Sequence, residues 1–226
     1  MYNSKEIKDI LFTHGADLCG IANIARFKNA PDGFTPTDIY NKTKSVLVFA
    51  QKLPAGTINA KSCIPYTHIN DLIMRAVDQM TFKISCHLDN LGIENVIIPT
   101  DDPYEYWDAE KTTGKAILSL RHAAWLAGLG KLGKNTLLIN DQYGNMIQIG
   151  AILLPIELAP DPMAEYEVCP EECDLCIEDC PVSALDGNTV DQKLCRPVSN
   201  SKNEKGYYLK KCYKCRSACP NFAGIN

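Results

Sequence analysis

The chain has 226 residues, 46% of them hydrophobic and 22% charged, so it can bury the core of one large domain or of two small ones. Its formal net charge of −4 argues against a protein that holds nucleic acid mainly through phosphate contacts, so nucleic acid is not an expected partner. The first residues lack the apolar core of a secretory signal, and no run of about 18 apolar residues predicts a membrane helix. We therefore expect a cytoplasmic chain without a membrane partner.

The first half of the sequence predicts alternating helices and strands. The apolar positions of 67–91 recur at 3.6-residue spacing until Gly92, which is typical of a long amphipathic helix. The β-branched run at 44–50 favours a buried strand. In chain order the predicted elements are a helix over 5–12, strands over 17–22 and 44–50, a helix over 67–91 and a strand over 95–99.

The middle of the chain predicts an ordered loop and further regular elements. Residues 101–113 combine acids with Tyr104, Tyr106 and Trp107, and we expect them to form a loop or lid. The remaining predicted elements are a helix over 115–127 closed by Gly128, a hairpin of 136–139 and 146–154 that turns at 141–144, and a proline-marked linker near 155–162.

Eight of the eleven cysteines lie in the last quarter of the chain, and their spacing indicates iron–sulfur clusters. An odd number of cysteines without a signal peptide does not suit a disulfide framework. A [4Fe–4S] cube takes three thiolates from a close run and one from afar, and the cysteine before a proline ligates the other cluster. The predicted sets are Cys169, Cys173, Cys176 and Cys219 for one cluster, and Cys180, Cys195, Cys212 and Cys215 for the other.

Zinc is the alternative metal, because Cys-x2-Cys pairs also hold zinc. Zinc does not account for two Cys-x3-Cys-Pro endings, at 176–181 and 215–220, in a crossed arrangement. The first spacing, from Cys169 to Cys173, holds Pro170 and is one residue longer than the usual spacing. This extra residue predicts either a local bulge or a labile cluster.

The glycines at 128, 130 and 133 match Gly-x-Gly-x-x-Gly, but a helix precedes them and a strand follows. A dinucleotide or phosphate loop needs the opposite order, so neither is predicted. Two alternatives remain for these glycines. They make room for a flat ligand or another backbone, or they form a helix cap and a tight turn with Lys131 and Lys134 in solvent.

One long motif resembles the epoxyqueuosine reductase family, which is akin to the reductive dehalogenases. It reads Ser119-Leu-Arg-His-Ala-Ala-Trp-Leu-Ala-Gly-Leu-Gly-Lys-Leu-Gly-Lys-Asn-Thr-Leu-Leu-Ile-Asn140 and is followed by Tyr143-Gly144 and by Cys-x2-Cys-x3-Cys-Pro. The resemblance spans nearly the whole chain and implies an α+β fold. It implies a nitroreductase-like, cobalamin-binding sandwich over 1–160, followed by a ferredoxin-like domain with two [4Fe–4S] clusters over 161–226.

The resemblance also implies a corrin site along residues 127–136. There the glycines give the macrocycle room, and Lys134 and Asn135 offer donors to its amides. His122 and Tyr143 lie near this turn and are candidate catalytic residues, with packing as the alternative for each. FMN is the alternative occupant of the site. The predicted cofactor-binding residues are Gly128, Leu129, Gly130, Gly133, Lys134, Asn135 and Thr136.

Two departures from the family bear on the activity. The tRNA-modifying members carry a catalytic aspartate about one helix length before Ala-Gly-Leu-Gly, where this chain has Gly114, and longer members continue into a helical region that helps with tRNA. We therefore expect an oxidoreductase that passes electrons from an external low-potential donor through its clusters to cobalamin, for reduction of a small molecule. The alternatives are an electron carrier that acts on a corrinoid partner protein, and an epoxyqueuosine reductase acting on tRNA.

Overall fold

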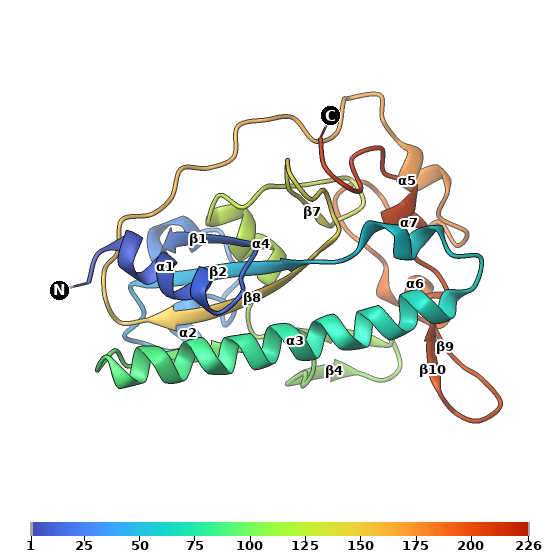
Figure 1. The fold of residues 1–226 in the computed structure, drawn as a ribbon. Helices are drawn as coiled ribbons and strands as arrows, with labels where there is room; N and C mark the ends of the chain where they lie inside the picture. The colour runs from blue at the N-terminus through green and yellow to red at the C-terminus, as the bar shows by residue number, and fades with distance from the viewer. Residues whose placement is uncertain (1, 226) are drawn as a thin grey trace.

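The structure, a computed structural model, describes residues 2–225 and is built around a four-stranded antiparallel sheet in the order β1-β2-β8-β3 (Figure 1). The two longest strands lie side by side in its centre and pair along their whole length, from Ser45 opposite Leu154 to Lys52 opposite Ile147. The strands are β1 (Leu18–Asn23), β2 (Ser45–Lys52), β3 (Val96–Ile98) and β8 (Ile147–Leu154).

Both faces of this sheet are buried, which explains the uninterrupted apolar runs of its central strands. In β2, Leu47 and Phe49 point into a core on one face, and Val46 and Val48 point into a second core on the other. The first core is covered by α1 (Ser4–Thr13) and α3 (Cys63–Asn90), and the second by α4 (Leu120–Leu126).

The predicted elements of the first half are confirmed. An Asn3–Glu6 capping box starts α1, and Ser62 caps α3, which begins a turn earlier than its apolar pattern does. No helix within residues 2–225 is both long and apolar enough to cross a membrane. The short connecting elements here are η1 (Ile24–Phe27), α2 (Pro36–Ile39) and η2 (Ala55–Asn59).

The predicted helix over 115–127 is wrong in its first third. Thr113–Lys115 form strand β5, which pairs with β4 (Tyr106–Asp108), and the helix begins only at Leu120. The alanine- and leucine-rich pattern does not show that residues 113–115 pair with a neighbouring strand. The expected loop at 101–113 therefore carries one strand of a short hairpin.

The predicted hairpin between 136–139 and 146–154 is also wrong. Strand β7 (Leu138–Ile139) pairs with β6 (Lys131–Leu132), and only an isolated bridge joins Asn140 to Gly144. Strand β8 is apolar on both faces, so it lies between β2 and β3 in the sheet.

The cysteine-rich segment has short elements and returns to the sheet. The backbone N–H of Asn145 donates to the Phe222 carbonyl at 3.1 Å, and Tyr213 and Phe222 pack against the α3 side of the core. The preceding linker is held in place by Asp161, whose carboxylate accepts from the N–H of Ile21 and the ammonium of Lys8. The elements are α5 (Leu175–Glu178), α6 (Gln192–Ser199), β9 (Asn200–Lys202), β10 (Tyr208–Lys210) and α7 (Lys214–Ser217).

Candidate cofactor site

Four cysteines line one small cavity in the cysteine-rich segment. Three of them come from the close run around α5, and the fourth, Cys219, comes from beyond α7. Burial and the neighbouring thiols of Cys169 and Cys219 raise the pKa of Cys176 to about 11. The structure thus brings together the first predicted set, which is Cys169, Cys173, Cys176 and Cys219.

Two members of the second predicted set, Cys195 and Cys212, lie near a third, Cys215. Burial is the main reason that the pKa of the Cys215 thiol is raised to about 11. The charge of Arg216 lowers this pKa, and the nearby Cys195 and Cys212 thiols raise it. Cys180 ends the α5 turn, where its sulfur accepts from the N–H of Ala184 at 3.3 Å. Buried thiols with raised pKa values stay protonated until a metal displaces the proton, so metal binding here releases protons.

The arrangement of these side chains differs from a site for one ion. Within residues 2–225, no three His, Cys, Asp or Glu side chains converge as ligands of a single metal ion. Zinc needs four ligands around one centre, whereas in a cube each thiolate binds its own iron at a separate corner.

The glycines of the 128–136 turn admit the chain's own backbone. A Cβ atom at Gly128 would lie 2.1 Å from the Pro162 carbonyl oxygen, and one at Gly130 would lie 2.3 Å from that of Ile139. Gly128 also has φ +79°, a conformation that favours glycine. Close approach of another backbone therefore describes both positions, and Gly128 is also the predicted end of the helix, directly after the C-cap residue Ala127 of α4.

Two predicted corrin-binding side chains contact the cysteine-rich segment instead. The backbone N–H of Lys134 lies 3.4 Å from the Cys169 sulfur, and its ammonium donates to Asp174 at 2.8 Å. The Asn135 amide donates to the Cys215 carbonyl at 3.1 Å. Leu129 is buried in the core. The 128–136 turn therefore links the four-stranded sheet and its helices to both groups of cysteines.

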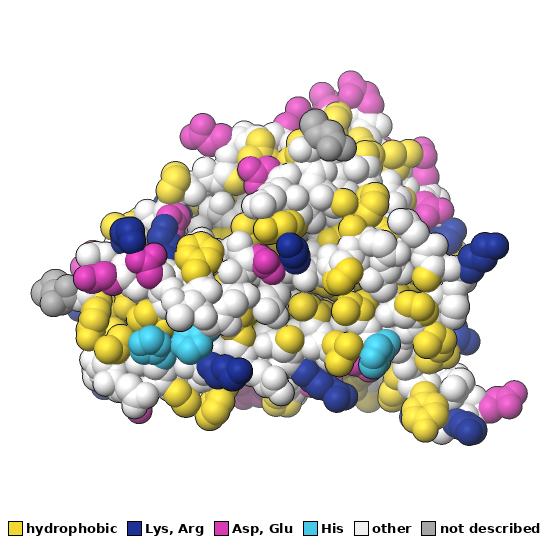
Figure 2. Space-filling view, viewed as in Figure 1, with side chains coloured by type: hydrophobic (Ala, Val, Ile, Leu, Met, Phe, Trp, Pro, Cys, Tyr) yellow, Lys and Arg dark blue, Asp and Glu magenta, His cyan; other side chains and the backbone are white. Residues whose placement is uncertain are grey.

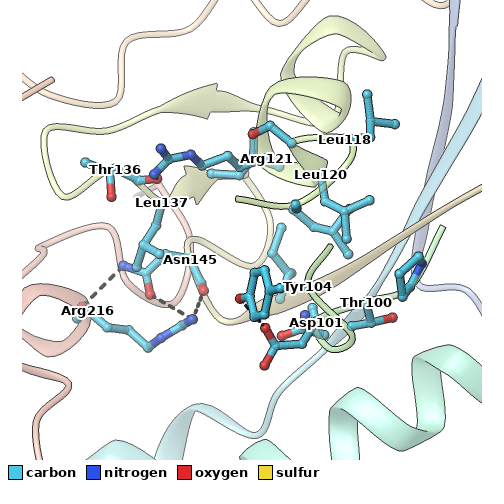
Figure 3. A pocket seen from close by; sticks show the side chains of 17 residues that line it. Thr100, Asp101, Tyr104, Leu118, Leu120, Arg121, Thr136, Leu137, Asn145 and Arg216 are labelled. Atoms are coloured by element: carbon cyan, nitrogen blue, oxygen red, sulfur yellow. Dashed lines mark hydrogen bonds between the residues drawn. The ribbon is translucent and has the colours of Figure 1, made fainter. Parts of the chain in front are cut away.

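Two cavities meet beside this turn. The Tyr104 cavity, of about 430 Å³, lies between α4, β8 and the loop after β3, and Figure 3 shows its lining side chains. The His122 cavity, of about 410 Å³, extends from α4 past Gly133 to Cys169. Arg121 and Thr136 line both cavities, and the guanidinium of Arg121 donates to the Thr136 carbonyl at 2.8 Å.

The Tyr104 cavity has an apolar wall and a few polar groups. The Tyr104 hydroxyl donates to Asp101 at 2.7 Å, as Figure 3 shows, and burial followed by this bond raises the pKa of the phenol. The hydroxyl of Thr100 is buried without a hydrogen-bond partner. Burial lowers the pKa of Arg121. Such a pocket, apolar with few fixed polar groups, is typical of ligand sites.

The two predicted catalytic residues lie in different surroundings. His122 lines the His122 cavity, with Nδ1 at 2.7 Å from the Ser119 hydroxyl, and burial and Arg121 lower its pKa. Tyr143 is not among the residues that line either cavity, and the ammonium of Lys52 lies 5.5 Å from its ring centroid.

Sequence reasoning missed several polar residues of the Tyr104 cavity. Arg121 stood in the family motif, and Asp101 in the aromatic and acidic loop, but neither was singled out. Thr100 and Asn145 carried no signal, because single polar residues at the ends of strands are common.

The sequence of this chain is similar to curated reductases of two kinds. It is 34% identical over 123 residues to the epoxyqueuosine reductase of Staphylococcus aureus, an alignment that covers 49% of this chain and 31% of that protein. It is 31% identical over 188 residues to the tetrachloroethene reductive dehalogenase of Desulfitobacterium hafniense, covering 82% of this chain and 31% of that protein. No family model matches the chain.

Solved structures of both kinds share the fold. A reductive dehalogenase whose structure suggests a mechanism for B12-dependent dehalogenation gives a TM-score of 0.69 at 17% identity, over 96% of this chain and 31% of that chain. An epoxyqueuosine reductase with an epoxyqueuosine-modified tRNA stem loop gives 0.64 at 17% identity, over 96% of this chain and 64% of that chain.

These similarities place the chain among mixed α/β proteins related to two groups of reductases. The resemblance to the epoxyqueuosine reductases and reductive dehalogenases seen in its sequence is thereby confirmed. The chain spans about a third of the length of the curated relatives it matches.

Proposed function

We propose that the chain is an iron–sulfur oxidoreductase that passes electrons from two [4Fe–4S] clusters to a bound cobalamin, for reduction of a small substrate. The observation that carries this proposal is the continuity of the site: Cys169 belongs to one group of cysteines and also lines the His122 cavity. In this proposal residues 1–160 hold the macrocycle and residues 161–226 hold the clusters.

The residues around the cavities fit a flat cofactor with polar edges. Leu118, Leu138 and Ile149 give the Tyr104 cavity an apolar wall. Thr100 lines the same cavity, and its hydroxyl oxygen is buried without a hydrogen-bond partner. Arg121 bonds Thr136 and lies between the two cavities. Its side chain must therefore move aside for one flat ligand to fill both. When bound, a cobalamin supplies a redox-active cobalt centre, and FMN is the alternative occupant.

We propose Tyr104 as the proton donor, ahead of His122 and Tyr143. Its ring occupies the space above Gly114, where a Cβ would lie 3.0 Å from the tyrosine ring. Gly114 stands where the resembled tRNA-modifying enzymes carry an acid, so the Tyr104–Asp101 pair takes the place of that acid. A raised pKa keeps the phenol protonated at neutral pH, which is the state that a proton donor needs.

The second candidate function is epoxyqueuosine reduction on tRNA. It is favoured by the curated relative of that name and by the solved relative that holds a tRNA stem loop. That structure runs against the expectation, drawn from net charge alone, that nucleic acid is not a partner.

The test is anaerobic purification followed by iron, sulfide, zinc and cobalt analysis and by titration with cobalamin and with FMN. About eight irons per chain and a cobalamin spectral change support the proposal. Iron without cobalamin uptake leaves an electron carrier, and zinc in place of iron overturns both.

Single cysteine variants make this test specific. Cys176→Ser and Cys215→Ser are each expected to lose about half of the iron, because each removes a ligand of one cluster. Cys86→Ser is the matched control, since Cys86 is exposed on α3 and outside both groups. Equal iron in all three variants would contradict the assignment.

A further inference from the structure

The cysteine-rich segment is divided sharply by charge. Residues 161–192 carry ten acids and no base, whereas residues 193–216 carry eight bases and one acid. The acids are Asp161, Glu165, Glu167, Glu171, Glu172, Asp174, Glu178, Asp179, Asp186 and Asp191, and the bases are Lys193, Arg196, Lys202, Lys205, Lys210, Lys211, Lys214 and Arg216. The overall net charge of −4 conceals this basic region.

Within the basic stretch, residues 200–210 form a projecting ribbon. Strands β9 and β10 pair, and their connecting turn extends away from the rest of the molecule beyond the start of α3 (Figure 1). Figure 2 shows hydrophobic, basic and acidic side chains at the lower right corner, where this ribbon lies, and mainly acidic charged side chains along the upper edge. Tyr207 and Tyr208 are 66% and 65% exposed, whereas large aromatic side chains are usually at least partly buried.

The lysines of the ribbon lack partners within the protein. Within residues 2–225, Lys202 and Lys205 of the ribbon, and Lys193 and Lys211 on either side of it, form no salt bridge, and all four are exposed. The ammonium of Lys202 lies over the ring of Tyr208, at 4.8 Å from its centroid. Exposed basic and aromatic side chains with no internal role are typical of a surface that binds an acidic partner.

The second group of cysteines lies at the base of this ribbon. Cys195 is on α6, which leads directly into β9, and Cys212 follows β10 by two residues. The backbone N–H of Lys211, next to Cys212, donates to Ser199 at 2.9 Å and joins the two ends of the ribbon. A partner seated on the ribbon is therefore close to the ligands of one cluster.

We infer that the β9–β10 ribbon is the docking surface for a small acidic one-electron carrier protein, which reduces the cluster of Cys180, Cys195, Cys212 and Cys215. This inference rests on the proposed function, because it needs that cluster. In the step the carrier loses one electron and the cluster gains it, and no bond forms or breaks. The alternative partner of a basic, aromatic surface is RNA, but the position beside the cluster ligands favours a redox protein.

The experiment uses the reconstituted protein and a reduced plant-type [2Fe–2S] ferredoxin, an acidic low-potential carrier. The rate of cluster bleaching is measured in stopped flow for Lys202→Glu/Lys205→Glu and for the control Lys28→Glu/Lys44→Glu. The control changes the net charge equally, at exposed lysines in the sheet domain. Dithionite, a small reductant that needs no docking surface, is the reference reductant.

We expect the ribbon variant to be reduced about tenfold more slowly than the control by ferredoxin at low salt, and the difference to vanish at about 0.5 M salt, where charges are screened. Dithionite is expected to bleach both variants equally. Equal ferredoxin rates with normal dithionite bleaching overturn the docking surface alone. Loss of tRNA stem-loop binding with an unchanged ferredoxin rate overturns it in favour of RNA. No bleaching by dithionite overturns the proposed function with it.

Discussion

Tyr104 owes its place in the cavity to contacts from three parts of the chain. Its ring lies on Gly114, its hydroxyl bonds Asp101, and the guanidinium of Arg196 lies 5.5 Å from its ring centroid. The bond to Asp101 orients the phenol, and burial keeps it protonated. A proton donor needs both conditions.

Tyr104→Phe tests this role. Under the proposed function we expect turnover to fall about a hundredfold, assayed with tetrachloroethene and with an epoxyqueuosine stem loop, the compounds in the names of the two kinds of relative. Cluster bleaching by dithionite is expected to be unchanged, because Tyr104 is not one of the predicted cluster ligands. Tyr143→Phe is the competing variant, and loss of turnover there with full activity in Tyr104→Phe would reverse the assignment.

Glycine is needed at position 128 because the backbone of the linker near 155–162 passes directly over it. Gly128→Ala is expected to lower the free energy of unfolding by about 2 kcal/mol or more, because the new Cβ strains a positive φ and meets the Pro162 carbonyl. Thermal melting measures the loss. Gly56→Ala is the control, since a Cβ there has nothing within 4 Å. An equal melting temperature in both variants would show that the linker is not fixed against this turn.

At the scale of elements, α1 and α3 are joined by a pair of histidines. His14 Nε2 lies 3.1 Å from His87 Nδ1, and burial, followed by the charges of His87 and Lys83, lowers the pKa of His14. These effects disfavour the protonated form of His14 in the folded chain. Between the lowered pKa and the ordinary value of about 6.5, the unfolded chain therefore binds more protons than the folded chain.

The melting temperature is accordingly expected to fall as the pH drops below about 6.5, and to be insensitive to this pair at higher pH. In His14→Gln the melting temperature should fall less between neutral pH and acidic pH, even where the substitution lowers the melting temperature at neutral pH. His68→Gln, at an exposed position of α3, should leave the slope as it is. A slope that is the same in all three proteins would exclude the histidine pair as its source.

Across the whole molecule, the cysteine-rich segment and the sheet domain share packing. Gln192 of α6 bonds both the N–H and the carbonyl of Gly114, each at 3.1 Å, and Phe222 packs against the α3 core. The segment that holds the cysteines therefore also positions the loop that carries Tyr104. Loss of metal in one part is expected to reach the other.

Iron–sulfur reconstitution should therefore raise the temperature of one cooperative melting transition for the whole chain, because the clusters bind the folded state only. Calorimetry of the protein before and after reconstitution measures this shift. Two separate transitions, with only the smaller one moved by iron, would show that the two parts fold independently.

The helices and strands with strong periodicity, the cysteine groups and the family resemblance could all be predicted from the sequence. Each depends on neighbours along the chain, as in the 3.6-residue pattern of 67–91 or the run from Cys169 to Cys180. Such patterns depend on local geometry, so they can be recognised in the sequence without knowledge of the tertiary structure.

The surfaces that those elements meet are visible in the folded chain alone. Strand β8 lies between β2 and β3 rather than in a hairpin, Lys134 bonds Asp174, and Tyr104 lies over Gly114. These contacts join residues far apart in the chain, where no local pattern constrains the pairing. The cavities follow from such contacts, and for this reason Thr100 and Arg121 became visible as site residues only in the folded chain.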